Sequence, residues 1–252
     1  MTIYEIISLV ISVVAILIPF FQMIWKKVFQ KPKIKYYTDE KSTIFFNRSG
    51  SYIKINGVIE AMNQPVSIKR IDAVITRTKD GKKKNLTWSS FISPINQNFI
   101  GNFTQTTEVA HPFRIPENSI SCAFTEFSDE FQSSWKSINL NTKDLYSSVK
   151  TIINSEKNYE ECEKEYKSSD FYNEAKQKVT TEFFWEISKY DLKIIISYLN
   201  KKKEYNYQFE IDSSDNYSLN NNIEEVLLYP LKQEFKIPTT INTAEVELHE
   251  KN

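Results

Sequence analysis

The chain is poor in the residues from which most catalytic and metal sites are built. Its 252 residues include two cysteines, two histidines and four glycines. Cys122 and Cys162 are widely separated, so their spacing matches neither a zinc site nor a disulfide framework. A phosphate-binding loop needs several glycines whose amides face the ligand, whereas Gly81 stands alone before three lysines. We therefore expect no metal and no cofactor, and we expect the protein not to be an enzyme.

An excess of either charge is also missing, since 32 Lys and Arg balance 32 Asp and Glu. Proteins whose main ligand is nucleic acid normally carry a basic excess, so no nucleic-acid partner is expected. Aromatic residues, in contrast, are plentiful, with 17 Phe, 14 Tyr and 4 Trp. These residues supply a hydrophobic core and exclude disorder throughout the chain.

The most informative feature is an uncharged apolar run from Ile6 to Trp25. As a helix, such a run is about 30 Å long, which is the thickness of the hydrocarbon core of a bilayer. No basic residue precedes the run and its last part is bulky where a cleavage site would be small, which argues against a cleaved signal peptide. A buried core helix would be amphipathic, whereas this one is apolar on all sides. The run predicts a transmembrane anchor, with the lipid bilayer as the first partner.

Basic residues crowd the C-terminal flank of the run, and Glu5 is the charged residue on the other side. The positive-inside rule then predicts a single-pass inner-membrane protein with its N-terminus outside and its C-terminal domain in the cytoplasm. Two further lysine runs, 82–84 and 201–203, are expected at hairpin tips, where such runs are most often simply solvated. As a functional alternative, we expect lipid-headgroup contacts from Trp25, Lys26, Lys27, Lys31, Lys33, Lys35, Lys201, Lys202 and Lys203.

Small residues share one face of the predicted span. Ser8, Ser12, Ala15 and Pro19 follow one another at intervals of four, three and four. Such a face lets helix backbones approach closely, so it predicts a homo-oligomer formed through the span. The alternative is that the spacing arises by chance and that Pro19 only kinks the last turn.

The rest of the chain is predicted to be mainly β with an α insertion. Alternating apolar residues between Lys33 and Phe127, and again in 190–211, favour an antiparallel Ig-like β-sandwich that carries a helical insertion and a C-terminal helix. Asp80-Gly81 marks a hairpin turn, and the alternation changes phase near Arg70, where a bulge is expected. The predicted segments are a transmembrane anchor with a basic juxtamembrane stretch (1–31), the first part of the sandwich (32–140), the helical insertion (141–183), a closing hairpin and helix (184–235) and a flexible tail (236–252).

Some details of this prediction leave alternatives open. Lys201–Lys203 is expected to form the turn of the last hairpin, Ser169 to cap a helix, and Ser218 to cap a final helix that ends at Pro230. A short edge strand is expected near residues 246–248. Two separate domains divided near residue 140 are the alternative to one sandwich with an insertion.

These features favour a membrane-anchored cytoplasmic binding or scaffold module that localises an unidentified protein partner at the membrane. The alternative is a membrane effector of a bacterial defence system, whose spans oligomerise and perturb the bilayer. The chain resembles bacterial anti-phage membrane effectors in layout, with a single span and a soluble sensor domain. An unrecognised enzyme on an anchor is a third possibility.

Overall fold

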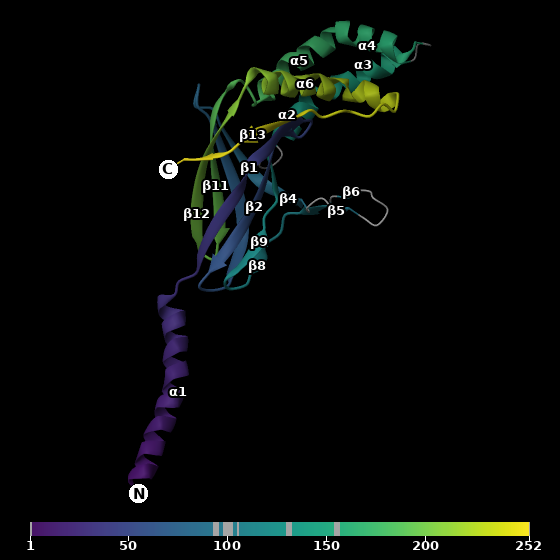
Figure 1. Ribbon diagram of the computed structural model, residues 1–252. Helices are drawn as coiled ribbons and strands as arrows, with labels where there is room; N and C mark the ends of the chain where they lie inside the picture. The colour runs from purple at the N-terminus through teal and green to yellow at the C-terminus, as the bar shows by residue number, and fades with distance from the viewer. Residues whose placement is uncertain are drawn as a thin grey trace.

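The protein consists of a long N-terminal helix, a β-barrel-like sheet and a cap of helices (Figure 1). The computed structural model describes residues 2–92, 96–97, 103–104, 106–129, 133–153 and 157–251. The helices are α1 (Ile3–Phe29), α2 (Ser133–Asn141), α3 (Lys143–Ile153), α4 (Tyr159–Ser168), α5 (Asp170–Glu182) and α6 (Ser213–Glu234). The longer strands are β1 (Lys33–Asn47), β2 (Gly50–Met62), β3 (Val66–Arg77), β4 (Lys83–Ile92), β10 (Thr125–Asp129), β11 (Ser188–Tyr198), β12 (Lys201–Ile211) and β13 (Thr243–Glu247). The short strands are β5 (Asn96–Gln97), β6 (Phe103–Thr104), β7 (Thr107–Val109), β8 (Phe113–Ile115), β9 (Ser119–Cys122) and β14 (His249–Glu250).

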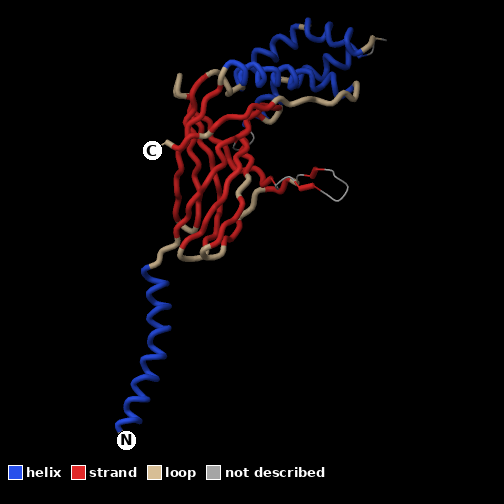
Figure 2. Tube along the Cα trace, in the orientation of Figure 1, coloured by secondary structure: helices blue, strands red, loops and turns tan. Residues whose placement is uncertain are grey.

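One antiparallel sheet contains all the described strands except the β5–β6 hairpin. Its order is β13-β1-β2-β10-β4-β3-β11-β12-β14, with β7, β8 and β9 paired to β4, β3 and β2 respectively. The chain therefore folds as mainly β protein with a separate apolar N-terminal helix, as predicted. The more specific prediction of an Ig-like sandwich is not confirmed, because these strands form one wrapped sheet that is nearly a barrel (Figure 2).

The C-terminal segment bridges the two edges of this sheet. Strand β13 pairs with β1, so that Val246 lies opposite Ser42, and β14 pairs with β12, so that Glu250 lies opposite Tyr207. Between them, the amide of Leu248 donates a hydrogen bond of 2.7 Å to the Glu40 carbonyl. The segment predicted as a flexible tail thus contains two strands, of which β13 overlaps the short edge strand expected near residues 246–248. The apolar side chains of β13 supply the reason, since they point into the core.

Inward-facing aromatic and branched residues fill the barrel. Tyr190 and Phe209 stack on neighbouring strands with ring centroids 5.1 Å apart. The buried indole of Trp185 donates a hydrogen bond of 2.8 Å to the Phe45 carbonyl. In β3 the buried residues switch phase at Lys69 and Arg70, where the pairing register with β11 shifts. The bulge predicted near Arg70 is therefore confirmed.

The helices α2–α6 cover one end of the barrel, opposite to α1 (Figure 1). Helix α5 is capped by Ser169, as predicted, because its hydroxyl accepts a bond from the amide of Tyr172. The last helix was predicted incorrectly at both ends. It begins earlier, with Asp212 as its N-cap, and it continues through Pro230 to Glu234. Ser218 therefore lies inside α6, and the first helix of the cap begins at Ser133 rather than after residue 140.

Candidate membrane-contact site

Helix α1 has the dimensions of a membrane span. Within the described residues it is the one helix that is long and apolar enough, over Ile3–Trp25, with a mean hydropathy of 2.5 and no residue of that window buried. The predicted face of Ser8, Ser12, Ala15 and Pro19 is exposed along this helix. The Ser12 hydroxyl donates a hydrogen bond of 2.8 Å to the Ser8 carbonyl. This bond satisfies the hydroxyl within its own helix.

Two polar side chains join the end of α1 to the barrel. The Asn63 amide group donates a hydrogen bond of 3.1 Å to the Lys31 carbonyl, and that of Gln64 donates one of 2.8 Å to the Gln30 carbonyl. Asn63 also donates from its backbone N–H to the side-chain oxygen of Asn118, at 3.2 Å. The β2–β3 turn thus contacts both the end of the helix and the neighbouring turn between β8 and β9.

Strand pairing brings three turns to this same end of the barrel. Lys33 at the start of β1 pairs with Met62, and Val66 on the other side of that turn pairs with Ile115. Ile68 pairs with Tyr198, which places the β11–β12 turn beside them. We call this end, made of the 62–66, 115–119 and 198–201 turns with residues 30–36, the basal end.

Each of the three basal turns contains a residue in the left-handed region of backbone conformation. The φ angles are 70° for Asn63, 53° for Asn118 and 50° for Leu199. Asparagine adopts this conformation readily, whereas leucine pays a steric cost of about 1 kcal/mol or more. Leu199 is nevertheless 39% exposed, and Ile120 nearby on β9 is 65% exposed. The basal end therefore presents apolar side chains to its surroundings.

Basic residues dominate the basal end. The segments 26–36, 58–70, 111–121 and 195–205 contain eleven Lys or Arg and three Glu, leaving 21 of the 32 basic and 29 of the 32 acidic residues for the rest of the chain. The net charge of the whole chain is zero, but its basic residues are concentrated at the basal end and its acidic residues elsewhere. The exposed basic residues described here are Lys31, Lys33, Lys35, Lys69, Arg70, Arg114, Lys201, Lys202 and Lys203.

The structure thus gathers most of the residues that the sequence predicted to contact headgroups. Lys201–Lys203 belong to the start of β12 rather than to a turn, which is formed by Leu199 and Asn200. Trp25 is 60% exposed at the end of the apolar window. The side chains of Lys26 and Lys27 lie outside the described residues.

Lys69 and Arg114 were missed by the sequence reasoning. Lys69 donates a hydrogen bond of 3.4 Å to the Asn200 side chain, and Arg114 lies on β8, opposite Ser67 of β3. Lys69 stands beside Arg70 within β3 and Arg114 stands alone within β8, and so few basic residues within a strand give no signal by themselves. The direction of each strand, counted from the end of α1, was the information that the sequence lacked.

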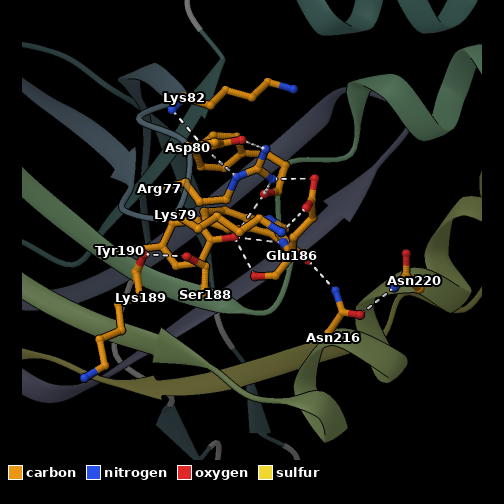
Figure 3. A network of polar contacts seen from close by, with 12 residues as sticks. Arg77, Lys79, Asp80, Lys82, Glu186, Ser188, Lys189, Tyr190, Asn216 and Asn220 are labelled. Atoms are coloured by element: carbon orange, nitrogen blue, oxygen red, sulfur yellow. Dashed lines mark hydrogen bonds and ion pairs between the residues drawn. The ribbon is translucent and has the colours of Figure 1, made fainter.

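The opposite end of the barrel is built around a buried guanidinium (Figure 3). The Arg77 side chain, 4% exposed, lies 2.6 Å from both Asp80 and Glu186, and it donates a 3.2 Å hydrogen bond to the Phe184 carbonyl. The bond to Asp80 raises the pKa of Arg77, and the same bond holds the pKa of Asp80 well below its usual range. The Tyr190 hydroxyl bonds to the carbonyls of Phe184 and Glu186. This network fixes the segment that leads from the helical cap into β11.

The third lysine run, 82–84, belongs to this distal end. Lys84 donates a hydrogen bond of 2.9 Å to the Ser134 hydroxyl, and the Asp129 carboxylate accepts one of 2.6 Å from the Ser134 amide. Burial lowers the pKa of Lys84. Gly50 lies beneath α2 with a φ of 105°, and a side chain there would meet the Ser134 Cβ at 2.6 Å. These contacts attach α2 closely to the barrel and give Lys84 a structural role.

No cluster of metal ligands occurs in the part of the chain that the structure describes. The two thiols are free, with Cys122 exposed and Cys162 buried. No family model matches the chain, and no curated protein matches it. A solved structure of a family 123 glycoside hydrolase from Clostridium perfringens is similar over 72% of this chain, with 9% identity and a TM-score of 0.32. This chain spans 27% of that one, and so weak a likeness carries no argument about function.

Proposed function

We propose that this protein is a single-pass membrane-anchored module that holds its cytoplasmic barrel and helical cap at the inner membrane and localises a protein partner there, without catalysis. The observation that carries the proposal is the pairing of an exposed, apolar 23-residue helical stretch, in which Glu5 is the one charged residue, with a folded domain attached to its end. A soluble protein would have to expose this whole apolar helix to water. At about 25 cal/mol per Å² of apolar surface, that cost is prohibitive without a lipid or protein environment.

The orientation in the proposal rests on charge. Basic residues follow the span and cover the basal end, which favours retention of that end on the cytoplasmic side. The distal end then faces away from the bilayer, and its helical cap is free to meet a soluble partner (Figure 1). Display of a binding surface at a fixed distance from a membrane needs no convergent catalytic residues.

The experiment has two stages. Membranes from cells that make the full chain are extracted with carbonate, and a C-terminal reporter that is active only in the cytoplasm reports the orientation. We expect the protein to resist extraction and the reporter to be active. Extraction without detergent, or a reporter active only in the periplasm, would contradict the proposal. Partners crosslinked in intact cells are then followed by fractionation, and a true partner leaves the membrane when this protein is removed.

Expression of the full chain also separates the proposal from the membrane-effector alternative. An anchor is tolerated, whereas an effector that breaches the bilayer stops growth and loses this effect when Ser8 and Ser12 are replaced by leucine. Loss of membrane potential in the wild type, absent from that variant, would favour the effector.

A further inference from the structure

We propose that the basal end of the barrel is a second membrane-contact surface, which docks on anionic phospholipid headgroups beside the span. The inference deepens the proposed function and rests on it, because the surface faces a bilayer only if α1 crosses one. It commits to the lipid bilayer as the occupant, and it adds Lys69, Arg114 and Leu199 to the lysines expected from the sequence.

Position along the chain sets the depth of this surface. The apolar window ends at Trp25, and Gln30 follows five residues later. At about 1.5 Å per helical residue, Gln30 lies about 7.5 Å beyond the hydrocarbon, which is close to the thickness of one headgroup layer. The Gln64 side chain bonds to Gln30 and that of Asn63 bonds to Lys31. The β2–β3 turn is therefore held at headgroup level by bonds to the end of the span.

The charge of the surface matches this depth. Lys69, Arg114 and Lys201–Lys203 are exposed at the same end of the barrel, on three separate parts of the sheet. They come from segments far apart in the sequence, and only the strand pairing unites them. Basic residues near an anionic leaflet attract it within a Debye length of about 8–10 Å. The basal end lies within that distance of the headgroups.

The β11–β12 turn supplies an apolar contact as well. Leu199 adopts a φ of 50° and remains 39% exposed at the tip, although neither feature favours a soluble fold. A headgroup-level position accounts for both, because the interface accepts apolar side chains next to basic ones. The strained conformation is then offset by transfer of the leucine side chain out of water.

The chain provides its own matched control. The 201–203 lysines start β12 at the basal end, and Lys82 and Lys83 lie exposed at the distal end. Two variants carry the same change of charge, Lys201→Glu with Lys202→Glu and Lys82→Glu with Lys83→Glu. Lys84 is left intact because it bonds to Ser134.

The test uses the full chain in vesicles of phosphatidylcholine, with or without phosphatidylglycerol. In a Cys122→Ser background, a fluorophore is attached at Asn200→Cys or, for comparison, at Lys82→Cys. Lipids with a nitroxide on the headgroup quench the fluorophore when it reaches the headgroup layer. We expect strong quenching at position 200 in anionic vesicles, weaker quenching in neutral vesicles or at high salt, and none at position 82.

The basal double variant should shift the docking equilibrium by about 25-fold or more, at about fivefold for each lysine lost, and the distal double variant should leave it unchanged. The inference would be overturned if position 200 showed no quenching, or if its quenching depended neither on lipid charge nor on the basal double variant. Carbonate extraction of the same vesicles keeps the two proposals apart. A protein that stays embedded but shows no quenching retains the anchor and loses the docking surface, whereas a protein that is extracted loses both.

Discussion

The two ends of the barrel are closed in different ways and use their charged residues differently. At the basal end, three short turns lie side by side, two of them joined by Asn63, and present a surplus of exposed basic residues. At the distal end, the helices α2–α6 cover the opening, and a buried arginine with two carboxylates fixes the segment that leads from α5 into β11. The basic residues of the basal end are therefore available to bind another surface, whereas the charged residues around Arg77 bind one another and hold the chain in place.

Two runs of three lysines show how far this difference extends. Lys82–Lys84 and Lys201–Lys203 look alike in the sequence, and each lies next to a hairpin turn. Lys84 is bonded to Ser134 beneath the helical cap, and burial lowers its pKa. Lys201–Lys203 remain exposed at the basal end, directly after the β11–β12 turn. The two runs have the same composition, so the end of the barrel at which each strand places its lysines decides whether they bond within the protein or remain exposed.

The largest effect is expected when the basal end is separated from the membrane by preventing α1 from inserting. Ile11→Arg combined with Val14→Arg places two charges near the centre of the span, at a cost of about 3 kcal/mol each in the bilayer. We expect the double variant to leave the membrane fraction on carbonate extraction while its barrel stays folded by circular dichroism. Ile11→Leu with Val14→Leu is the control and should remain embedded. Retention of the arginine variant would mean that α1 is not a span.

The distal end is tested by removing its central cation. Arg77→Leu leaves Asp80 and Glu186 close together without the buried guanidinium, and the Phe184 carbonyl loses a donor. We expect the free energy of unfolding to fall by about 3 kcal/mol. Chemical denaturation in detergent, followed by near-ultraviolet circular dichroism, measures this change.

Lys79→Leu is the matched control for that experiment. Lys79 pairs with the same Glu186, but its side chain is 45% exposed, so its removal should change the stability by less than about 1 kcal/mol. Equal effects of the two variants would show that burial of Arg77 does not matter.

A smaller effect is expected at the seam of the barrel, where β13 pairs with the edge strand β1 and β14 pairs with the edge strand β12. Val246 is 2% exposed in β13, and Val246→Ala removes about 2 kcal/mol of apolar burial. The neighbouring Glu245→Ala alters an exposed side chain and should stay within about 0.5 kcal/mol. Faster hydrogen exchange of the Tyr207 and Gln208 amides in the valine variant would show that the tail holds the seam closed. Unchanged hydrogen exchange of these amides would show that the seam between β1 and β12 stays closed without the contribution of β13.

Local signals explain what the sequence predicted well. The apolar run Ile6–Trp25 identified α1, which extends three residues before it and four residues beyond it. Asp80-Gly81 marked the turn between β3 and β4, and uninterrupted alternation identified β11 and β12. The Ser169 cap was also visible, because its hydroxyl bonds to an amide three residues away. Each of these features is decided by residues close together in the chain.

Long-range pairing explains what the sequence did not predict. Alternation of period two is the same in a sandwich and in a barrel, so it left the wrapping of the sheet open. Closure of the seam depends on β13 meeting β1 across almost the whole chain. The same holds for the basal end, where Lys69 and Arg114 reach the 201–203 lysines only through the strand order. The Pro230 position was misjudged because tertiary packing carries α6 through it.

The smallest expected effect concerns association of the span, which decides whether the basal end meets the membrane as one copy or several. We predict that the protein forms a homo-oligomer and that Ser8→Leu with Ser12→Leu weakens it about fivefold while insertion survives, because leucine fills the groove of small residues. Val10→Leu with Val13→Leu changes the opposite face and should have no effect. Crosslinking in membranes measures the oligomer. The effect is modest because the Ser12 hydroxyl already bonds to the Ser8 carbonyl, so that backbone proximity, rather than a hydroxyl bond, supplies most of the attraction. The prediction is wrong if the wild type is monomeric, or if Ser8→Leu with Ser12→Leu leaves the oligomer unchanged.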